Sequence, residues 1–242
     1  MRAVLLGVWV LLWCCVVQAQ RFESAAEGAN LVELYTSEGC SSCPPADAWL
    51  STLAADPQLF GTLFPVAFHV DYWNQLGWPD RFSSGRYSER QRSYVRQGHV
   101  SQVYTPGLVV NGQEWRGWLR GQRRWQIAPV TAGVLLLDYQ ADQLEARYNA
   151  TGRGRHALHL VRLGMGLHTE VKAGENSGRR LSHDFVVLDY HRRAPENGRW
   201  SLDLGAVPDK GQRRVALVAW VSLEANLQPL QVAGGFIDPE AQ

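Results

Sequence analysis

The feature that most constrains this chain is a pair of cysteines, Cys40 and Cys43, set between a strand-like and a helix-like segment. The run Leu31–Thr36 (LVELYT) is typical of a buried strand, and residues 43–55 have the apolar spacing of a helix. Cys40 is therefore expected at or just before a helix N-terminus, where free backbone N–H groups and the helix dipole favour a thiolate. Cys43 falls in the first turn, close enough to attack a mixed disulfide formed on Cys40. This placement favours a redox-active pair.

Two other interpretations of the pair stay open. A zinc site needs two further ligands, and the sequence has neither a second CxxC nor a closely spaced histidine pair, so no metal is predicted. A purely structural disulfide would close a very short loop and restrict the unfolded chain little, although exported cysteines oxidise readily. A thiolate pair that carries a soft metal ion, as in a metallochaperone, is a further possibility.

The N-terminal segment has the pattern of a secretory signal. Arg2 precedes an apolar stretch that is too short for a stable membrane span and ends in Val17-Gln18-Ala19, which suggests cleavage before Gln20. We therefore expect a signal peptide over residues 1–19, a secreted or periplasmic protein, and no stable membrane insertion after cleavage. Of the four cysteines, only Cys40 and Cys43 would remain, in an oxidising compartment. The formal net charge of +1 gives no attraction to nucleic acid.

The rest of the chain divides near residue 128. Residues 20–128 alternate strand-like runs (63–72 and 104–110) with a polar helix over 84–97 and a last helix over 119–128, which predicts an α/β domain. The four arginines of the polar helix are expected on a solvated face. Residues 129–242 contain eight short apolar or alternating runs between glycine-rich and proline-rich turns. The runs cover residues 134–139, 143–149, 156–163, 167–171, 184–191, 200–204, 215–223 and 230–236. Their spacing predicts an all-β, sandwich-like C-terminal domain.

Residues 31–128 resemble the thioredoxin superfamily in the order strand, CxxC, helix, strand, helix, and a strand that opens with Thr105-Pro106 before GLVVNG. The resemblance implies an α/β thioredoxin-like fold, in the short, glutaredoxin-like version because too few residues precede the first strand. It also implies that Cys40 attacks, that Cys43 resolves the mixed disulfide, and that Pro106 is a cis-proline. The dipeptide between the cysteines is Ser-Ser, which differs from the Gly-Pro or Pro-His of better-known members.

A closer resemblance covers nearly the whole chain beyond residue 19. The chain is similar to a family of secreted bacterial proteins of uncharacterised function with a thioredoxin-like core. The segments that carry this resemblance are VELYTSEGCSSCPPAD, HVDYWNQLGWPDRFS, YTPGLVVNG and GENSGRRLSHD. It implies no assayed activity.

The segment after the second strand supplies candidate substrate-binding residues. The first two strands are expected to be parallel, so this segment should emerge at the same sheet edge as the CxxC. Trp73, Trp78 and Phe82 could form an apolar platform there, or simply pack beneath the loop, which is slightly favoured. The Thr105 backbone, brought beside Cys40 by a cis-proline, could pair with an extended substrate.

Four further residues, Glu38, Asp71, His183 and Asp184, could affect the cysteine pair or form a site of their own. Glu38, if close, would disfavour a thiolate on Cys40. Asp71 could carry a proton for Cys43 or cap the following loop, and the cap is favoured. The GENSG turn with His183 and Asp184 could form a binding loop or metal site, but a plain glycine-rich turn is favoured.

From these observations we expect an exported thiol-disulfide oxidoreductase-like protein that uses Cys40 and Cys43 and needs no cofactor. Its partner would be a protein or a small thiol or disulfide. The alternative is a non-enzymatic secreted binding module, in which the disulfide is structural and the β-rich half supplies the recognition surface.

Overall fold

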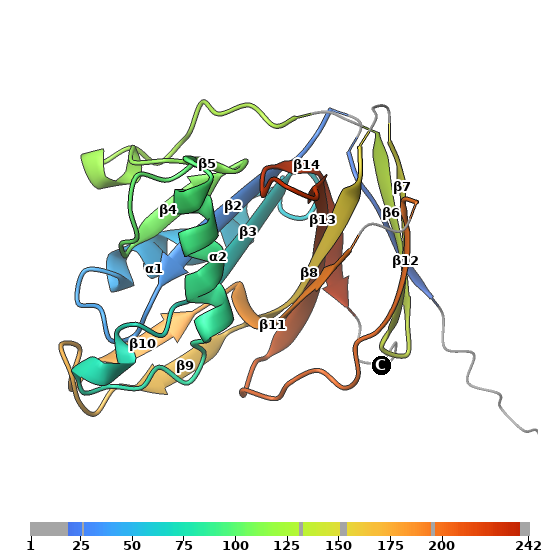
Figure 1. The fold of residues 1–242 in the computed structure, drawn as a ribbon. Coiled ribbons are helices and arrows are strands. Elements are labelled where there is room, and N and C mark those ends of the chain that lie inside the picture. The colour runs from blue at the N-terminus through green and yellow to red at the C-terminus, as the bar shows by residue number, and fades with distance from the viewer. Residues whose placement is uncertain (1–18, 26, 131–132, 151–153, 195–196, 238–242) are drawn as a thin grey trace, which may run out of the picture.

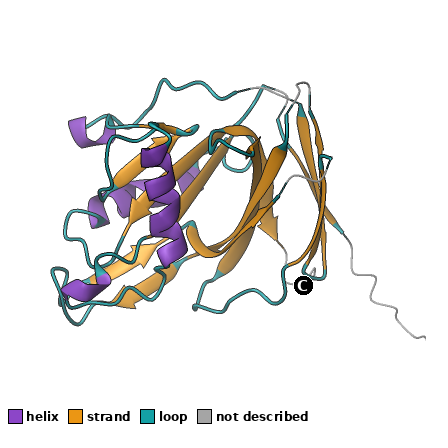
Figure 2. Ribbon diagram, in the orientation of Figure 1, coloured by secondary structure: helices purple, strands orange, loops and turns teal. Residues whose placement is uncertain are grey.

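The computed structural model describes residues 19–25, 27–130, 133–150, 154–194 and 197–237 (Figure 1). The expected signal peptide, residues 1–19, lies outside these ranges except for Ala19. Its cleavage therefore stays a prediction. Within the described ranges strands far outnumber helices (Figure 2).

A single eight-stranded mixed sheet forms the centre of the molecule. Its strand order is β14-β13-β8-β11-β3-β2-β4-β5. In chain order the strands are β2 (Asn30–Thr36), β3 (Leu63–His69), β4 (Gly107–Val110), β5 (Gln113–Glu114), β8 (His156–Met165), β11 (Val186–Arg193), β13 (Arg214–Leu223) and β14 (Pro229–Ile237).

Strand β11 joins the two halves of the chain into this sheet. It pairs antiparallel with β8 on one side and lies parallel to β3 on the other, where Val186 faces Ala67. The Ala67 N–H donates to the Phe185 carbonyl over 2.8 Å at this seam. The expected fold class, an α/β thioredoxin-like core followed by an all-β sandwich-like domain, is therefore wrong. The protein is mostly β, and one sheet runs through both halves of the chain. The two halves share this sheet because β11 pairs with the edge of β3 and satisfies backbone groups that a separate core would have left open.

A second, four-stranded antiparallel sheet packs against the β-rich end of the large one (Figure 1). Its order is β1-β6-β7-β12, so the N-terminal strand β1 belongs to this sheet. Leu135 and Leu137 of this sheet share a buried core with Leu158 and Leu217 of the large sheet. The four strands are β1 (Gln20–Glu23), β6 (Val134–Gln140), β7 (Gln143–Asn149) and β12 (Arg199–Asp203).

The remaining elements surround the other end of the large sheet. A two-stranded ribbon, β9 (Leu167–Glu170) with β10 (Arg180–His183), lies beside helix α1 (Pro44–Thr52). Helix α2 (Gly85–Arg96) begins at Ser84, whose hydroxyl accepts the Arg86 N–H. Short 3₁₀ turns cover Leu53–Ala55, Asn74–Leu76 and Trp118–Arg120. In the described part of the chain, no helix has the length and apolarity to cross a membrane.

Helix α2 is less solvated than its four arginines suggest. Arg90 is buried and its guanidinium forms a two-pronged ion pair with Glu33 of β2, at 2.7 and 2.9 Å. The Tyr94 and Tyr35 hydroxyls donate to the same carboxylate at 2.6 and 2.9 Å. The expectation of a solvated arginine face is therefore wrong at Arg90, because β2 carries a buried carboxylate that needs a cation.

Candidate functional site

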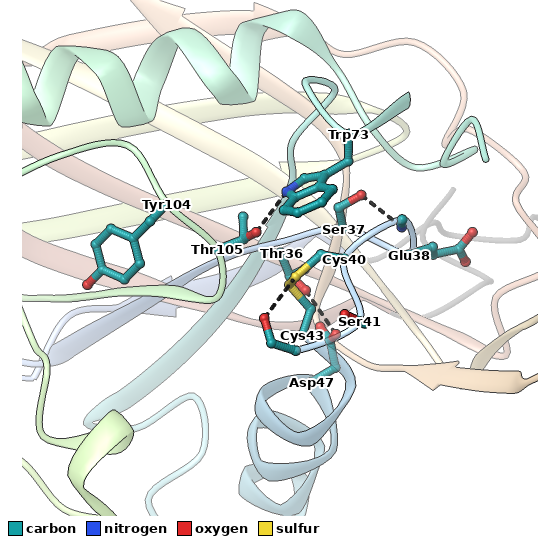
Figure 3. Close-up of a disulfide and its surroundings, with 12 residues drawn as sticks. Thr36, Ser37, Glu38, Cys40, Ser41, Cys43, Asp47, Trp73, Tyr104 and Thr105 are labelled. Carbon is teal, nitrogen blue, oxygen red and sulfur yellow. Dashed lines mark hydrogen bonds between the residues drawn. A yellow bond between two sulfur atoms is a disulfide. The ribbon is translucent and has the colours of Figure 1, made fainter. Parts of the chain in front are cut away.

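Cys40 and Cys43 form a disulfide at the junction between β2 and α1 (Figure 3). Their Cα atoms lie 5.5 Å apart. Helix α1 begins at Pro44, so Cys43 occupies the N-cap and Cys40 lies three residues earlier, in a turn. Cys40 therefore lies farther before the helix N-terminus than the sequence predicts, and Cys43 precedes the first turn instead of lying in it. The Ser42 hydroxyl lies 3.3 Å from the Cys40 sulfur and would stabilise a thiolate there after reduction.

The disulfide is covered by protein. Cys40 is 1% exposed and Cys43 is 0% exposed, whereas Ser41 and Ser42 between them are exposed. Trp73 lies over the turn, and a side chain at Gly39 would meet the Trp73 Cβ at 3.1 Å. Gly39 is therefore needed for this close approach. Any substrate sulfur must reach the pair past this cover.

Thr105 and Pro106 complete one side of the pair. The Thr105–Pro106 bond is cis, as predicted, and Pro106 is buried. Figure 3 shows Thr105 beside the disulfide, where its hydroxyl accepts a hydrogen bond from the Trp73 indole over 2.8 Å. The structure thus brings Thr105 and Trp73 to the cysteines. Contact between the Pro106 ring and the two sulfurs stays a prediction.

The glycine-rich loop Gly174–Gly178 closes over the cysteine turn from the far end of the sequence. The Asn176 amide donates to the carbonyl oxygens of Glu38 and Cys40 at 2.8 and 2.9 Å. The Glu175 carboxylate accepts the Ser41 N–H over 3.0 Å, and hydrogen bonding by the side chain and then the backbone of Ser41 lowers the pKa of Glu175. The interpretation of this loop as a plain turn missed these contacts.

Trp78 and Glu38 bind each other. The Trp78 indole donates to the Glu38 carboxylate over 2.9 Å, and Figure 3 shows the Glu38 side chain turned away from the disulfide. Trp78 and Trp73 are half-buried and Phe82 is buried, so these aromatic residues pack beneath and within their loop. A role of Trp78 in substrate binding stays a prediction. Asp71 accepts the Ser88 hydroxyl at the start of α2, which agrees with a local structural role.

Next to the disulfide lies a buried cluster of two histidines and three carboxylates. His69 ends β3, His183 ends β10, and Asp47 lies on α1 four residues after Cys43. The ring centroids of His69 and His183 are 5.1 Å apart, and one ligand atom from each of the two and from Asp47 lies within 4.8 Å of the others. Asp80 and Glu38 complete the cluster behind the histidines.

Burial and charge shift the titration of this cluster. Burial alone would lower the pKa of His69, but Asp80 at 2.7 Å, with Asp47 and Glu38, raises it to about 9. Burial raises the pKa of Asp47, against the opposing effect of the two histidines. Burial would also raise the pKa of Asp80, yet its ion pair with His69 and the N–H donors of Glu38 and Phe82 lower it. At neutral pH His69 is therefore a cation paired with the ionised Asp80, and burial favours the neutral form of Asp47.

The fold and the site define the chain as a mostly β protein with a covered CxxC disulfide at a strand–helix junction. The family model for a protein of unknown function, DUF1223, matches residues 31–222, and the chain belongs to that family. The expected membership of a family of uncharacterised function is thereby confirmed. The family model does not show the wider relationship to the thioredoxin superfamily.

Two solved structures resemble this one. A crystal structure of a protein from Agrobacterium tumefaciens is 25% identical in sequence and has a TM-score of 0.61. The match covers 88% of this chain and 96% of that one. HBP35 of Porphyromonas gingivalis is 15% identical, with a TM-score of 0.55 over 89% of this chain and 77% of that one. The second likeness shows the fold alone. Among curated proteins, none matches this chain.

Sequence analysis missed the residues that hold the site from outside the cysteine motif. Asp47, Glu175 and Asn176 were not singled out, and His183 was assigned to a turn. The strongest available signal was GENSGRRLSHD, a polar segment with two glycines. Nothing local in that segment shows that it contacts residues 38–41.

Proposed function

We propose that this protein exchanges thiols and disulfides through Cys40 and Cys43 after export from the cytoplasm. The observation that carries the proposal is the position of the disulfide: it lies between β2 and the start of α1, beside the Thr105–Pro106 segment. The local chemistry resembles that of the thioredoxin superfamily, and only that chemistry, not the fold class, is carried over here.

The exchange balances in two steps. In the reduced protein the Cys40 thiolate attacks a substrate disulfide, forms a mixed disulfide and releases one substrate thiolate. The Cys43 thiolate then attacks the Cys40 sulfur, closes the disulfide and releases the second substrate thiolate. Two electrons pass from the cysteine pair to the substrate, and the released thiolates take protons from water. The reverse sequence oxidises a substrate dithiol.

The surrounding residues have defined parts in this proposal. Ser42 stabilises the Cys40 thiolate, since its hydroxyl is within 3.3 Å of that sulfur. Thr105 offers its backbone to an extended substrate, and Trp73 must move aside because Cys40 is only 1% exposed. The substrate is a protein or a small thiol or disulfide, and no cofactor is needed.

One observation favours the alternative, a non-enzymatic binding module with a fixed disulfide. Both cysteines are buried, and Asn176 ties the carbonyl of Cys40 to a loop far along the chain. Reactive cysteines are usually partly exposed, whereas buried structural ones are inert. The two functions therefore differ in how easily the bond is reduced.

The reduction potential separates the two. Purified protein is equilibrated in a series of thiol redox buffers, and the free thiols are counted by mass spectrometry after alkylation. A structural bridge should have a potential below about −300 mV, and an exchanging one should lie above it. A value below that limit would overturn the proposal.

Two variants test the roles of the cysteines. Cys43→Ser should trap mixed disulfides with partner thiols through Cys40, and Cys40→Ser should not. After mild reduction Cys40 should also alkylate faster than Cys43 at neutral pH. Equal alkylation rates, or trapping through Cys43 only, would reject the assignment.

A further inference from the structure

We propose that His69, His183 and Asp47 form a buried binding site for a divalent transition metal, with Zn²⁺ as the best match. One donor atom from each residue lies within 4.8 Å of the donors of the other two. The three residues come from β3, β10 and α1, so the fold, and not a local motif, brings them together. The site is separate from the proposed thiol exchange.

Unpartnered nitrogen atoms point to a missing ligand. His69 is 0% exposed and His183 is 2% exposed, yet His69 Nε2 and His183 Nδ1 have no hydrogen-bond partner. Buried polar side-chain atoms nearly always have a partner, in the protein or in a bound water or ion. Binding would displace the Nε2 proton of His69, and the ion would accept the lone pair of each nitrogen.

Each histidine is oriented by a carboxylate on its other nitrogen. Asp80 Oδ2 lies 2.7 Å from His69 Nδ1, which leaves Nε2 for the ion. Glu38 Oε1 lies 3.3 Å from His183 Nε2, within ion-pair distance although not aligned as a hydrogen bond, which leaves Nδ1. Histidine ligands of metals almost always have such a partner, because it sets the tautomer and the orientation of the ring.

The supporting carboxylates are themselves held in place. Asp80 accepts the backbone N–H groups of Glu38 and Phe82, both at 2.9 Å. Asp47 accepts the Thr36 hydroxyl over 2.9 Å. Phe82 packs its ring within 5.3 and 5.7 Å of the His69 and His183 ring centroids and closes one side. These contacts hold the donor groups near one another in the folded protein.

The distances fit a small ion after modest side-chain rotation. Zinc lies about 2.0–2.2 Å from nitrogen and oxygen ligands, so the donors of one tetrahedral site are roughly 3.4 Å apart. The present donors are within 4.8 Å of one another. Two imidazoles and a carboxylate are the ligand types that zinc and other first-row divalent ions take.

Charge argues for a cation at this position. Glu38, Asp47 and Asp80 are all buried and face two histidines, which cannot compensate all three carboxylates, and buried charges are costly unless they are paired. A divalent ion between the histidines and Asp47 would supply that compensation. An open cavity of about 360 Å³, lined by Pro44, Asp47, Ser51 and residues 179–184, gives the ion a path from the surface.

Zn²⁺ binding is measured on the purified chain with its disulfide intact. The protein is stripped with a chelator, dialysed into metal-free buffer and titrated with Zn²⁺ in a calorimeter. We expect one ion per chain, a raised melting temperature, and Co²⁺ absorption bands of a tetrahedral site. The proposal would be overturned if the stripped wild-type protein took up no Zn²⁺ at concentrations of about 10–100 µM, the range of the dissociation constants of weak sites.

Variants assign the ligands. His69→Gln and His183→Gln should weaken Zn²⁺ binding at least about 100-fold, and Asp80→Asn, behind His69, about 10–100-fold. His168→Gln is the matched control, since His168 lies on the neighbouring strand and binds Ser182 instead. If the histidine variants do not fold, Asp47→Asn, which keeps the size of the side chain, provides the test.

The cysteines provide the last control. A Cys40→Ser/Cys43→Ser variant should still bind one Zn²⁺, which separates this site from a metal held by the thiolates. Loss of the ion in that variant, or full binding in folded Asp47→Asn and His69→Gln, would show that the buried cluster is only an ion-pair network.

Discussion

The indole Nε1 of Trp73 donates a hydrogen bond to the hydroxyl of Thr105 over 2.8 Å, and this bond lies beside the disulfide (Figure 3). The segment after β3 and the segment before β4 are thereby joined next to Cys40. If exchange requires Trp73 to move, this bond helps to set the rate at which the disulfide becomes accessible.

Replacing Trp73 with phenylalanine tests whether this residue limits access to the disulfide. Trp73→Phe keeps an aromatic ring but removes the donor, and a hydrogen bond is worth about 0.5–1.5 kcal/mol. We therefore expect reduction by dithiothreitol to be about 2–10-fold faster than in the wild type, measured by alkylation of released thiols. Trp125→Phe is the control, because its indole binds Asn30 elsewhere. An unchanged rate would show that Trp73 does not limit access.

Asn176 is predicted to stabilise the cysteine turn. Asn176→Ala leaves the buried carbonyls of Glu38 and Cys40 without their donor, which should cost about 1–3 kcal/mol of unfolding free energy. Ser177→Ala, which removes a hydroxyl from an exposed contact with Lys172, should cost much less. Chemical denaturation of the two oxidised variants measures the difference. Equal losses would contradict a specific role of the amide.

The ion pair between Arg90 and Glu33 should matter far more than any surface pair. Arg90→Met leaves a fully buried carboxylate uncompensated and should cost about 3–5 kcal/mol. Arg96→Met is the control, because its pair with Glu89 has side chains 59% and 55% exposed and should contribute about 1 kcal/mol or less. The double variant Glu33→Gln/Arg90→Met should recover part of the loss. Urea unfolding measures the stability of all three variants. A small effect of Arg90→Met would show that the buried Glu33 carboxylate does not depend on Arg90 for charge compensation.

His159 predicts how stability changes in mild acid. Burial, with the charges of Arg90 and Arg192, holds the pKa of His159 well below its usual value. Below about pH 6.5 the unfolded chain binds a proton that the folded protein refuses, so folding loses up to about 1.4 kcal/mol per pH unit as the pH falls. Above that pH the contribution is complete.

The measurement is the melting temperature between pH 7 and pH 5. The wild type should lose stability more steeply over this range than His159→Gln, even though the variant loses the contacts to Tyr190 and Ser222. His156, whose pKa burial also lowers, is present in both proteins and cancels. Parallel curves would mean that His159 does not resist protonation.

Local patterns predicted most of the strands. The run 143–149 is β7 with the same bounds, and the runs beginning near residues 134, 156, 215 and 230 correspond to β6, β8, β13 and β14. Strand β10 was missed because it is short and lies within a polar segment. The helix expected after residue 119 is only a 3₁₀ turn at Trp118–Arg120, since Gly121 adopts a positive φ of 81°.

Pairing between distant strands could not be predicted from the same patterns. A run such as residues 186–193 is apolar enough for any buried position, and nothing in it shows that Val186 faces Ala67. The candidate site has the same limit. The cysteines and Thr105-Pro106 are local motifs and were found, whereas Asp47, His69 and His183 come from three segments and become a cluster only after folding.

The bonds from Asn176 to the cysteine turn also set an order of events during synthesis. Asn176 follows Cys40 by 136 residues, and a chain is made from its N-terminus. The two thiols therefore leave the ribosome well before the loop that covers them. The pair is open to an oxidant in the unfinished chain, and that access closes when the last third of the protein folds.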